Sequence, residues 1–378
     1  MSEVSVYVHF PFCVRRCFYC DFVSTTELEL IEDYIGSLTE DIERSGYLIG
    51  KTVRTVYFGG GTPSTVPVRF LKTVLETLRK NSGSWEVSEF TIECNPESVT
   101  LDEIRSYRDM GVNRISLGVQ AFDDDVLKRS GRIHDTRTVL RALEIVRRFF
   151  DNVNLDFVVG LPGYDPSVVE SNLKLVESFR PEHVSVYALE LDEGTPLWRM
   201  IENGSIDIPN EDELESMLSD MYEGLLDLGY RRYEISNFSL EGKESLHNMV
   251  YWKNHDYTGF GVSAGGHIGR FRYVRTLDLR EYLENPLSNS YERQNDVLTE
   301  FKETLFMGLR LTDGLDLAEL EDRFGKDMVE SFSCHVKEDE LFEIGRGRLK
   351  LTEKGLDLSK IALEKVVNWD GVRCQISE

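Results

Sequence analysis

The chain has 378 residues, of which 41% are hydrophobic and 11% aromatic, and it carries a formal net charge of −24. This length suits one large domain and a smaller one. The negative charge argues against a nucleic-acid partner, because binding to phosphates needs a basic face. No run approaches the roughly 18 apolar residues of a membrane helix, and no leader pattern opens the sequence. We therefore expect a cytoplasmic protein, for which a peripheral membrane contact stays open.

Six short runs rich in β-branched and aromatic residues are spaced through the first half of the chain. The segments between them place apolar residues at i, i+3, i+4 and i+7, which is typical of amphipathic helices. Strands that are apolar throughout and alternate with helices predict a parallel sheet covered by helices. We therefore predict an α/β fold, a partial (β/α)6 TIM-like barrel over residues 1–205, with an open sheet as the alternative. The strand-like runs are residues 4–10, 53–60, 89–96, 114–120, 152–162 and 183–191.

Polar or glycine-rich motifs follow the end of nearly every predicted strand. They are the cysteine loop after Phe10 and the segments GGGTPS, ECNP, GVQAF and DFVVGLPG. In a (β/α) barrel, the loops at the carboxyl ends of the strands build the active site. The pattern therefore predicts one functional site at that rim.

The character of the sequence changes after about residue 205. Residues 206–290 form a predicted connecting region that contains the segment HNMVYW. Residues 291–378 form a predicted smaller α+β domain, in which helices followed by a hairpin with glycine at its tip suggest a winged helix. Winged helices often bind DNA, but residues 297–378 hold 12 Lys and Arg against 18 Asp and Glu, a net charge of −6. We therefore do not expect this domain to bind nucleic acid.

Half of the six cysteines lie within eight positions of one predicted loop. Zinc in a structural site takes four ligands, usually as two separated pairs, and this loop has no second pair. A [4Fe–4S] cluster held by three thiolates would keep one iron open for another ligand. A chance grouping of unrelated thiols is the remaining alternative. The grouped residues are Cys13, Cys17 and Cys20, whereas Cys94, Cys334 and Cys374 are scattered and are expected to carry no chemistry.

The sequence resembles the radical S-adenosylmethionine (SAM) enzymes, and within them the coproporphyrinogen III dehydrogenase-like (HemN/HemW) family. The similarity spans nearly the whole chain and implies that Cys13, Cys17 and Cys20 bind a [4Fe–4S] cluster. It further implies that SAM binds the fourth iron through its amino and carboxylate groups. The segments that carry the resemblance are YVHFPFCVRRCFYCDF, YFGGGTPS, ECNPES, RISLGVQAFDDDVLKRSGR and NLDFVVGLPG.

The same resemblance implies roles for residues around the cluster. The glycine turn that starts at Gly59 has no side chains, so its backbone can approach a ligand closely. A guanidinium suits the SAM carboxylate, acceptor side chains suit its amino group and ribose hydroxyls, and a tyrosine on the first strand would pack near the cluster. The implied SAM-binding residues are the turn residues Gly60, Gly61 and Thr62, the guanidinium of Arg132, the acceptors Glu93, Gln120 and Asp156, and Tyr7.

Two departures separate this chain from the dehydrogenases that it resembles. Those enzymes have a fourth cysteine two positions after the third, where this chain has Phe22, and a longer segment before the first strand.

Residues 247–252 match HNxxYW, a motif of the haem chaperones of this family. Because imidazole is a good axial ligand of haem iron, His247 is the predicted haem ligand, with His255 and His267 as alternatives. A core histidine beside two aromatic residues is the competing interpretation.

The resemblance therefore implies a haem chaperone that delivers haem to acceptor proteins, with a [4Fe–4S] cluster, SAM and haem as cofactors. The main alternative is an oxygen-independent coproporphyrinogen III dehydrogenase, which oxidises propionate chains through a 5′-deoxyadenosyl radical. A radical SAM enzyme that acts on haem itself is a third interpretation. The three differ in whether haem is carried, a porphyrinogen is oxidised, or haem is chemically changed.

Overall fold

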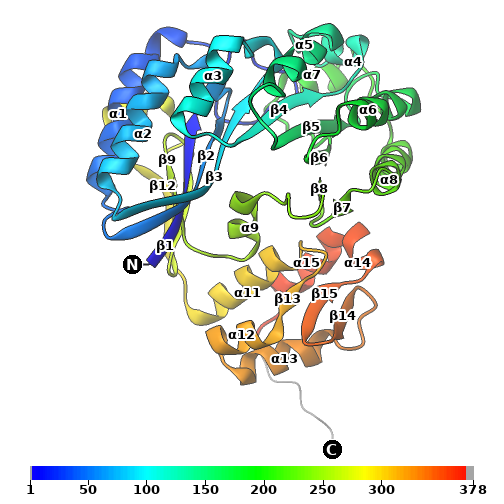
Figure 1. The fold of residues 1–378 in the computed structure, drawn as a ribbon. Coiled ribbons are helices and arrows are strands. Elements are labelled where there is room, and N and C mark those ends of the chain that lie inside the picture. Colours follow the sequence, from blue (N-terminus) through cyan, green and yellow to red (C-terminus); the bar gives the residue numbers. More distant parts are fainter. Residues whose placement is uncertain (1, 372–378) are drawn as a thin grey trace, which may run out of the picture.

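The computed structural model describes residues 2–371 and shows a large sheet with a smaller domain beside it (Figure 1). Six strands, β1 to β6, pair in chain order, and every pair between them is parallel. This arrangement confirms the predicted α/β fold with its six parallel strands. Their bounds are β1 (Ser2–Phe10), β2 (Lys51–Gly60), β3 (Ser84–Cys94), β4 (Arg114–Gln120), β5 (Val153–Val159) and β6 (His183–Ala188).

The helices that follow these strands cover the outer face of the sheet (Figure 1). Several begin at a side-chain cap, as at α6, where Asp165 accepts a hydrogen bond from the backbone of Ser167 and proline takes the first position. Within residues 2–371 we find no helix with the length and apolar character needed to cross a membrane. The bounds are η1 (Leu28–Leu30), α1 (Ile31–Ser45), η2 (Pro63–Thr65), α2 (Val68–Asn81), η3 (Pro96–Ser98), α3 (Leu101–Met110), α4 (Asp124–Arg129), α5 (Thr136–Val146), α6 (Pro166–Phe179), α7 (Pro196–Glu202) and α8 (Glu211–Asp227).

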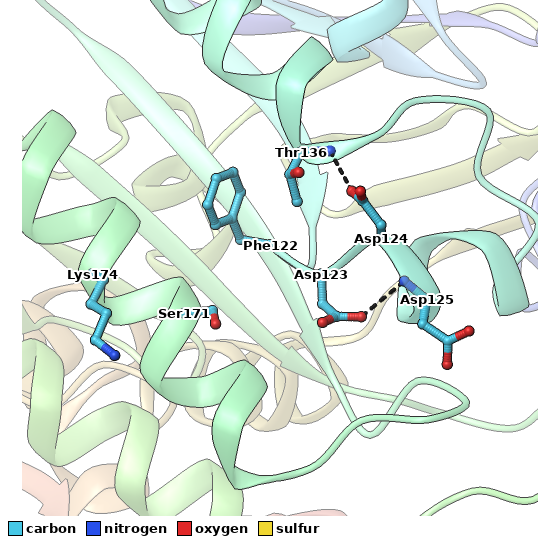
Figure 2. Close-up of a pocket in the computed structure, with 7 residues that line it drawn as sticks. All are labelled: Phe122, Asp123, Asp124, Asp125, Thr136, Ser171 and Lys174. Carbon is cyan, nitrogen blue, oxygen red and sulfur yellow. Dashed lines mark hydrogen bonds between the residues drawn. The ribbon is translucent and has the colours of Figure 1, made fainter.

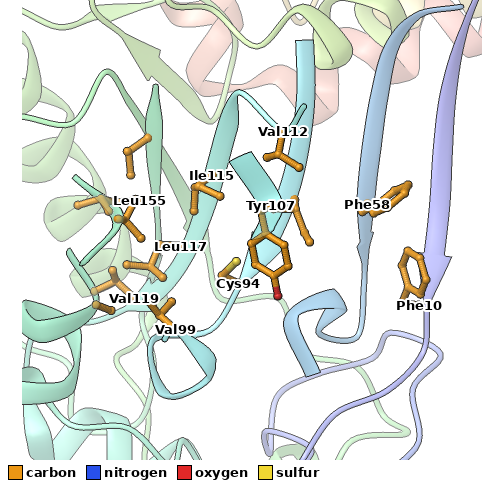
Figure 3. Close-up of a cluster of buried hydrophobic side chains, with 14 of the residues drawn as sticks. Phe10, Phe58, Cys94, Val99, Tyr107, Val112, Ile115, Leu117, Val119 and Leu155 are labelled. Atoms are coloured by element: carbon orange, nitrogen blue, oxygen red, sulfur yellow. The ribbon is translucent and has the colours of Figure 1, made fainter. Parts of the chain in front are cut away.

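The two faces of the sheet differ in polarity. Successive side chains of a strand point to opposite faces, and one set, which includes Phe10, Phe58 and Leu117, packs with Tyr107 of α3 into the apolar core (Figure 3). The other set contains buried polar side chains on all six strands. The prediction that the strands are apolar throughout is therefore wrong for this face of the sheet. This inner set includes Ser5, Thr55, Glu89, Thr91, Ser116, Asn154, His183 and Ser185.

The predicted connecting region, residues 206–290, contributes strands to both edges of the same sheet. On one edge β8 pairs antiparallel with β6, and on the other β9 pairs parallel with β1. The sheet thereby grows to twelve strands in the described part of the chain. The added elements are β7 (Arg231–Arg232), β8 (Asn237–Ser239), α9 (Leu246–Trp252), β9 (Tyr257–Phe260), β10 (Gly265–Ile268), β11 (Phe271–Arg275), α10 (Leu279–Glu284) and β12 (Asn289–Gln294).

The C-terminal domain has an apolar core of its own, built around Phe301, Phe332 and Trp369. Its three-stranded sheet ends in a hairpin that turns at Arg346 and Gly347, both with positive φ. Helices followed by this hairpin give the winged-helix order that the sequence suggested. The elements are α11 (Val297–Gly308), β13 (Leu315–Asp316), α12 (Leu317–Phe324), α13 (Lys326–Val336), β14 (Phe342–Gly345), β15 (Arg348–Leu351), α14 (Glu353–Asp357) and α15 (Ser359–Asn368).

A buried ion pair joins the added strands to the first helix. Arg275 of β11 donates to Asp41 of α1 at 2.6 Å, and their side chains are 2% and 0% exposed. The second oxygen of Asp41 accepts hydrogen bonds from the Tyr282 hydroxyl at 3.0 Å and the Gly261 backbone at 3.2 Å. The carboxylate therefore fixes three separate segments of the added region against α1.

We expect the Asp41→Ala substitution to lower the free energy of unfolding by about 3–5 kcal/mol, because it leaves the Arg275 guanidinium buried and unpaired. The double variant Asp41→Leu with Arg275→Met should lose less, since both charges are removed together. Urea denaturation followed by circular dichroism measures both. A single variant as stable as the wild type would show that the pair does not hold this edge.

Candidate functional site

The cysteine loop follows β1 and is held in place by backbone hydrogen bonds. The Cys13 N–H donates to the Thr25 carbonyl at 2.9 Å, which closes the loop on itself. The Phe18 N–H donates to the Ser130 carbonyl at 3.0 Å, and its ring lies against Gly131, where an added Cβ would be 3.0 Å from the ring. The loop is thus attached to the connection between α4 and α5, which carries Arg132.

The three thiols of this loop lie close to one another but not around one point. Burial raises the pKa of Cys13 and brings that of Cys20 to about 11, and the neighbouring Cys17 sulfur acts in the same direction on both. Over residues 2–371, no three His, Cys, Asp or Glu side chains converge on a position for one metal ion. The donor set therefore does not suit a single zinc ion. It fits a four-iron cluster, in which each thiolate binds a different iron.

The glycine turn after β2 packs directly against the cysteine loop. The Gly61 N–H donates to the Phe10 carbonyl at 2.8 Å, and a Cβ at Gly61 would lie 3.0 Å from the Cys13 sulfur. Gly60 has a φ of 115°, and a Cβ there would lie 2.7 Å from the ring of His9. Only glycine fits both positions, so the turn keeps backbone groups exposed beside the thiols.

Glu93 is the penultimate residue of β3, and its carboxylate points at the glycine turn. One oxygen accepts a hydrogen bond from the Tyr57 hydroxyl at 2.8 Å, and the other accepts one from the Gly60 N–H at 3.1 Å. Burial raises the pKa of Glu93 to about 7, against the opposing effect of the Tyr57 hydrogen bond. A cationic amino group near this carboxylate would favour its charged form.

Arg132 connects the cysteine loop to the ends of β3 and β4. It donates to the Cys17 sulfur at 3.2 Å, to the Asn95 side-chain oxygen at 2.7 Å and to the Gly118 carbonyl at 2.9 Å. Its Nε is buried without a hydrogen-bond partner. A buried unsatisfied donor is costly, so this atom marks a place for an acceptor such as a carboxylate.

Gln120 and Asp156 complete this end of the sheet. Gln120 has a φ of 67°, a left-handed conformation that is uncommon outside glycine. Residues in such strained conformations are often found at functional sites. Its amide lies next to Gly118, where an added Cβ would be 2.8 Å away. Asp156, paired in register with Gly118, accepts hydrogen bonds from Ser116 at 2.9 Å and Asn154 at 2.7 Å, and burial raises its pKa.

The ends of β2, β3 and β4 therefore carry five of the residues predicted to bind SAM, namely Gly60, Gly61, Thr62, Glu93 and Gln120. Arg132 reaches this end of the sheet from the connection between α4 and α5, and Asp156 lies in the middle of β5. Tyr7 belongs to the same group, because its hydroxyl lies 3.1 Å from His9 and its ring stacks on Tyr57 at 6.1 Å. Sequence reasoning missed Asn95, which donates to Thr62 at 2.9 Å and accepts from Arg132. The ECNP motif contains this asparagine, but only the fold shows that it bridges the turn and the guanidinium.

His247 lies inside the molecule, on the polar inner face of the sheet. Its Nδ1 is 2.7 Å from the Thr55 hydroxyl, its Nε2 is 2.8 Å from the Tyr251 hydroxyl, and the residue is 1% exposed. Burial lowers its pKa to about 3, and the charge of Arg114 adds to the effect. The predicted haem ligand thus has no free ring nitrogen in this structure.

The two alternative histidines differ sharply in exposure. The His267 side chain is 1% exposed, with Nε2 3.1 Å from Glu300, whereas the His255 side chain is 50% exposed and lies 3.7 Å from Glu319. Among the scattered cysteines, Cys94 is buried and Cys334 is exposed. Cys374 lies outside the described residues.

A cavity of about 430 Å³ lies away from this site, between the connection to α4 and helix α6 (Figure 2). Three aspartates and Lys174 line it, but Asp123 accepts hydrogen bonds from the backbones of Asp125 and Val126, and Asp124 accepts one from Thr136. These carboxylates serve as helix caps. The hydrogen bonds at the helix starts therefore account for these carboxylates, and we assign no ligand site to this cavity.

The fold and the site define a radical SAM protein. Residues 7–176 match the radical SAM superfamily and residues 297–358 match the HemN C-terminal domain. This fold implies a [4Fe–4S] cluster and SAM, and the thiols, the glycine turn and the unpartnered Arg132 donor fit both. A solved structure, entitled "Coproporphyrinogen III oxidase (HemN) from Escherichia coli is a Radical SAM enzyme", superposes with a TM-score of 0.83 over 97% of this chain and 90% of that one. Its 22% identity supports the shared fold alone.

Sequence identity to proteins named heme chaperone HemW is higher than the identity to this solved structure. The protein from Bacillus subtilis is 31% identical over 91% of this chain and 96% of its own length. The protein from Lactococcus lactis is 33% identical over 96% of each chain. The chain belongs to the HemW family.

The raised pKa of Glu93 predicts a pH-dependent contribution to stability. Between the ordinary pKa near 4.5 and the folded value near 7, the folded state binds the proton more tightly, so this contribution is lost as pH rises. We expect the stability of the wild type relative to Glu93→Gln to fall by about 2–3 kcal/mol between pH 5 and pH 8. Denaturation of both proteins without cluster or SAM measures the difference. A pH-independent difference would refute the proposed burial of this carboxyl group.

Replacing His247 by alanine should lower the free energy of unfolding by about 2–4 kcal/mol, because the Thr55 and Tyr251 hydroxyls lose a buried partner. The matched control is Leu246→Ala on the same helix, at a side chain that is 46% exposed, for which we expect a change within about 0.5 kcal/mol. Thermal and urea denaturation measure both. Equal losses in the two variants would contradict a special structural role for His247.

Proposed function

We propose that this protein is a haem chaperone, which binds haem and transfers it to acceptor proteins. The observation that carries the proposal is similarity over nearly the full length of relatives that bear this name, so that the barrel and the C-terminal domain are shared with them. Phe22 supports it as well, because it is exposed at the position where the dehydrogenases that the chain resembles have their extra cysteine.

In this proposal the loop thiols of Cys13, Cys17 and Cys20 hold the cluster. When bound, a cluster with one open iron supplies a coordination site for SAM and a source of single electrons. The protein supplies orientation: Arg132 has a free donor for the carboxylate, and Glu93 has a carboxyl group that a bound cationic amino group would hold in its charged form. Three thiols that must stay reduced suit the cytoplasm, where disulfides are rare.

Gln120 and Asp156 are proposed to accept the ribose hydroxyls, and Tyr7 is proposed to shield the cluster and the sulfonium. Tyr7 and Gln120 lie on β1 and β4, the strands next to those that carry the glycine turn and Glu93, and Asp156 lies one strand further along, on β5. Because Asp156 is fixed by its hydrogen bond with Ser116 and Tyr7 by its stacked ring, these two side chains orient a ligand at little cost in entropy.

The test is to reconstitute the protein without oxygen, confirm its iron content and SAM binding, and follow two reactions. Titration with ferric haem should show saturable binding, and addition of a haem-free acceptor protein should move the haem spectrum to that of the acceptor. With SAM, a reductant and coproporphyrinogen III, no protoporphyrinogen IX should form. Turnover in the second assay would show that the dehydrogenase interpretation is correct, and absence of haem binding would reject the chaperone.

A further inference from the structure

The inside of the barrel contains a guanidinium group that has no partner in the protein. Arg114 is the first residue of β4 and is 2% exposed, which makes it one of the largest fully buried side chains. Within residues 2–371 its guanidinium makes no hydrogen bond and no ion pair, and its Nε is enclosed without an acceptor. Buried charges are normally paired, because an uncompensated charge costs several kcal/mol. Arg114 therefore lacks an anionic partner.

The alternation of side chains along β4 shows where Arg114 points. Ile115 and Leu117 lie in the apolar core on the outer face of the sheet (Figure 3). Successive side chains of a strand point to opposite faces, so Arg114 and Ser116 point into the barrel. The Ser116 hydroxyl does so, since it donates to Asp156 at 2.9 Å. The guanidinium thus faces the polar interior.

Three carboxyl groups share this inner face, but each of them has other partners. Glu89 accepts hydrogen bonds from the start of α9. Glu93 accepts them from the Tyr57 hydroxyl and the glycine turn, and Asp156 from two polar side chains. Burial raises the pKa of Glu93 to about 7 and raises that of Asp156, and the charge of Arg114 opposes both rises without direct contact. The described part of the chain therefore supplies no counter-ion in contact with Arg114.

The register of the strands places Arg114 next to the candidate SAM site. Arg114 of β4 lies opposite Thr91 of β3, and Ser116 lies opposite Glu93. Two residues of a strand span roughly 7 Å, so Arg114 is one such step further from the cysteine loop than Glu93. The Thr91 hydroxyl is also buried without a partner, in a residue that is 0% exposed. An anion between these two strands would satisfy both unpaired side chains.

Arg132 also has an unpaired Nε, but its surroundings differ from those of Arg114. Arg132 already donates to Cys17, Asn95 and Gly118 at the cysteine loop. SAM has a single carboxylate, and Arg132 is the group proposed to bind it. Arg114 therefore requires an anion from a second molecule.

We propose that Arg114 and Thr91 form a carboxylate-binding site inside the barrel, beside the candidate SAM site. A carboxylate matches the planar guanidinium through two charge-assisted hydrogen bonds, and its remaining lone pairs can accept from a hydroxyl. Binding transfers no proton or electron and forms no covalent bond. The inference goes beyond the proposed haem function and does not depend on it.

The experiment uses propionate as the probe and compares Arg114→Met with Arg141→Gln, which removes an exposed guanidinium of α5. Each protein is reconstituted without oxygen and titrated by calorimetry at constant ionic strength. We expect the wild type and Arg141→Gln to bind propionate equally, and Arg114→Met to bind it about tenfold more weakly or less, because a charged hydrogen-bond partner is lost. Propionamide, the neutral analogue, should not bind. A wild type that does not bind propionate, or an Arg114→Met variant that binds it as tightly, overturns the proposal.

Two further measurements test whether the pair is unpartnered in the protein alone. Without added anion, Arg114→Met should melt no lower than the wild type, since an unpaired buried charge is replaced by an apolar side chain. A much lower melting temperature would reveal a structural partner of the arginine and would refute the site. Thr91→Val, which keeps the shape of the side chain, should bind propionate about threefold more weakly. Unchanged affinity in this variant would remove Thr91 from the site.

Controls with other anions separate the remaining explanations. Chloride that binds as tightly as propionate would indicate an adventitious ion only. A loss of SAM affinity in Arg114→Met as large as in Arg132→Met would assign the SAM carboxylate to Arg114 and overturn the proposal.

A carboxylate of this kind occurs on small organic acids and on porphyrin side chains. Displacement of propionate by coproporphyrin III would identify a porphyrin as its source, and absence of displacement would identify a small organic acid. A wild type that binds propionate but no haem would support this site while rejecting the proposed function.

Discussion

The structure depends on the rule that polar groups buried inside the barrel must find hydrogen-bond partners. Glu89 of β3 shows how this rule builds the molecule, because it is 3% exposed and yet carries a carboxylate. It accepts hydrogen bonds from the backbone N–H groups of Leu246 and His247, both at 2.9 Å, and from the Ser245 hydroxyl at 3.3 Å. The free N–H groups at the start of α9 and the buried carboxylate satisfy each other, so α9 is fixed against the strands.

The attachment of α9 and the candidate cofactor site lie at different positions along the strands. At the carboxyl ends of the strands, the glycine turn, Glu93 and Arg132 surround the loop thiols. At the opposite end, α9 presents its last turn and His255 to the C-terminal domain. The buried part of HNxxYW belongs to neither surface: His247 and Tyr251 join α9 to Thr55 of β2. The buried part of the motif therefore holds α9 against β2 and leaves no ring nitrogen of His247 free for a ligand.

Much of the SAM region could be predicted from the sequence, because parallel strands bring the residues after each strand to one edge. Glu93 is the penultimate residue of one strand and Gln120 ends the next, so their proximity follows from the chain order. Asn95 and Tyr57 were not predicted, since their roles depend on contacts with Thr62, Arg132 and Glu93 across strands. The polar inner face was also missed, because a run such as VSVYVHF contains enough valine to read as wholly apolar.

The sequence by itself determined the six parallel strands, the cysteine loop and the separate C-terminal domain. Each of these is encoded by local patterns of hydrophobicity, spacing and turn residues. Only the tertiary structure decided that β9 pairs with β1 and that the imidazole of HNxxYW is buried, whereas the histidine three positions after the motif is exposed. The physical reason is that burial and the availability of a ring nitrogen depend on which distant groups, here Thr55 and Glu89, meet the helix.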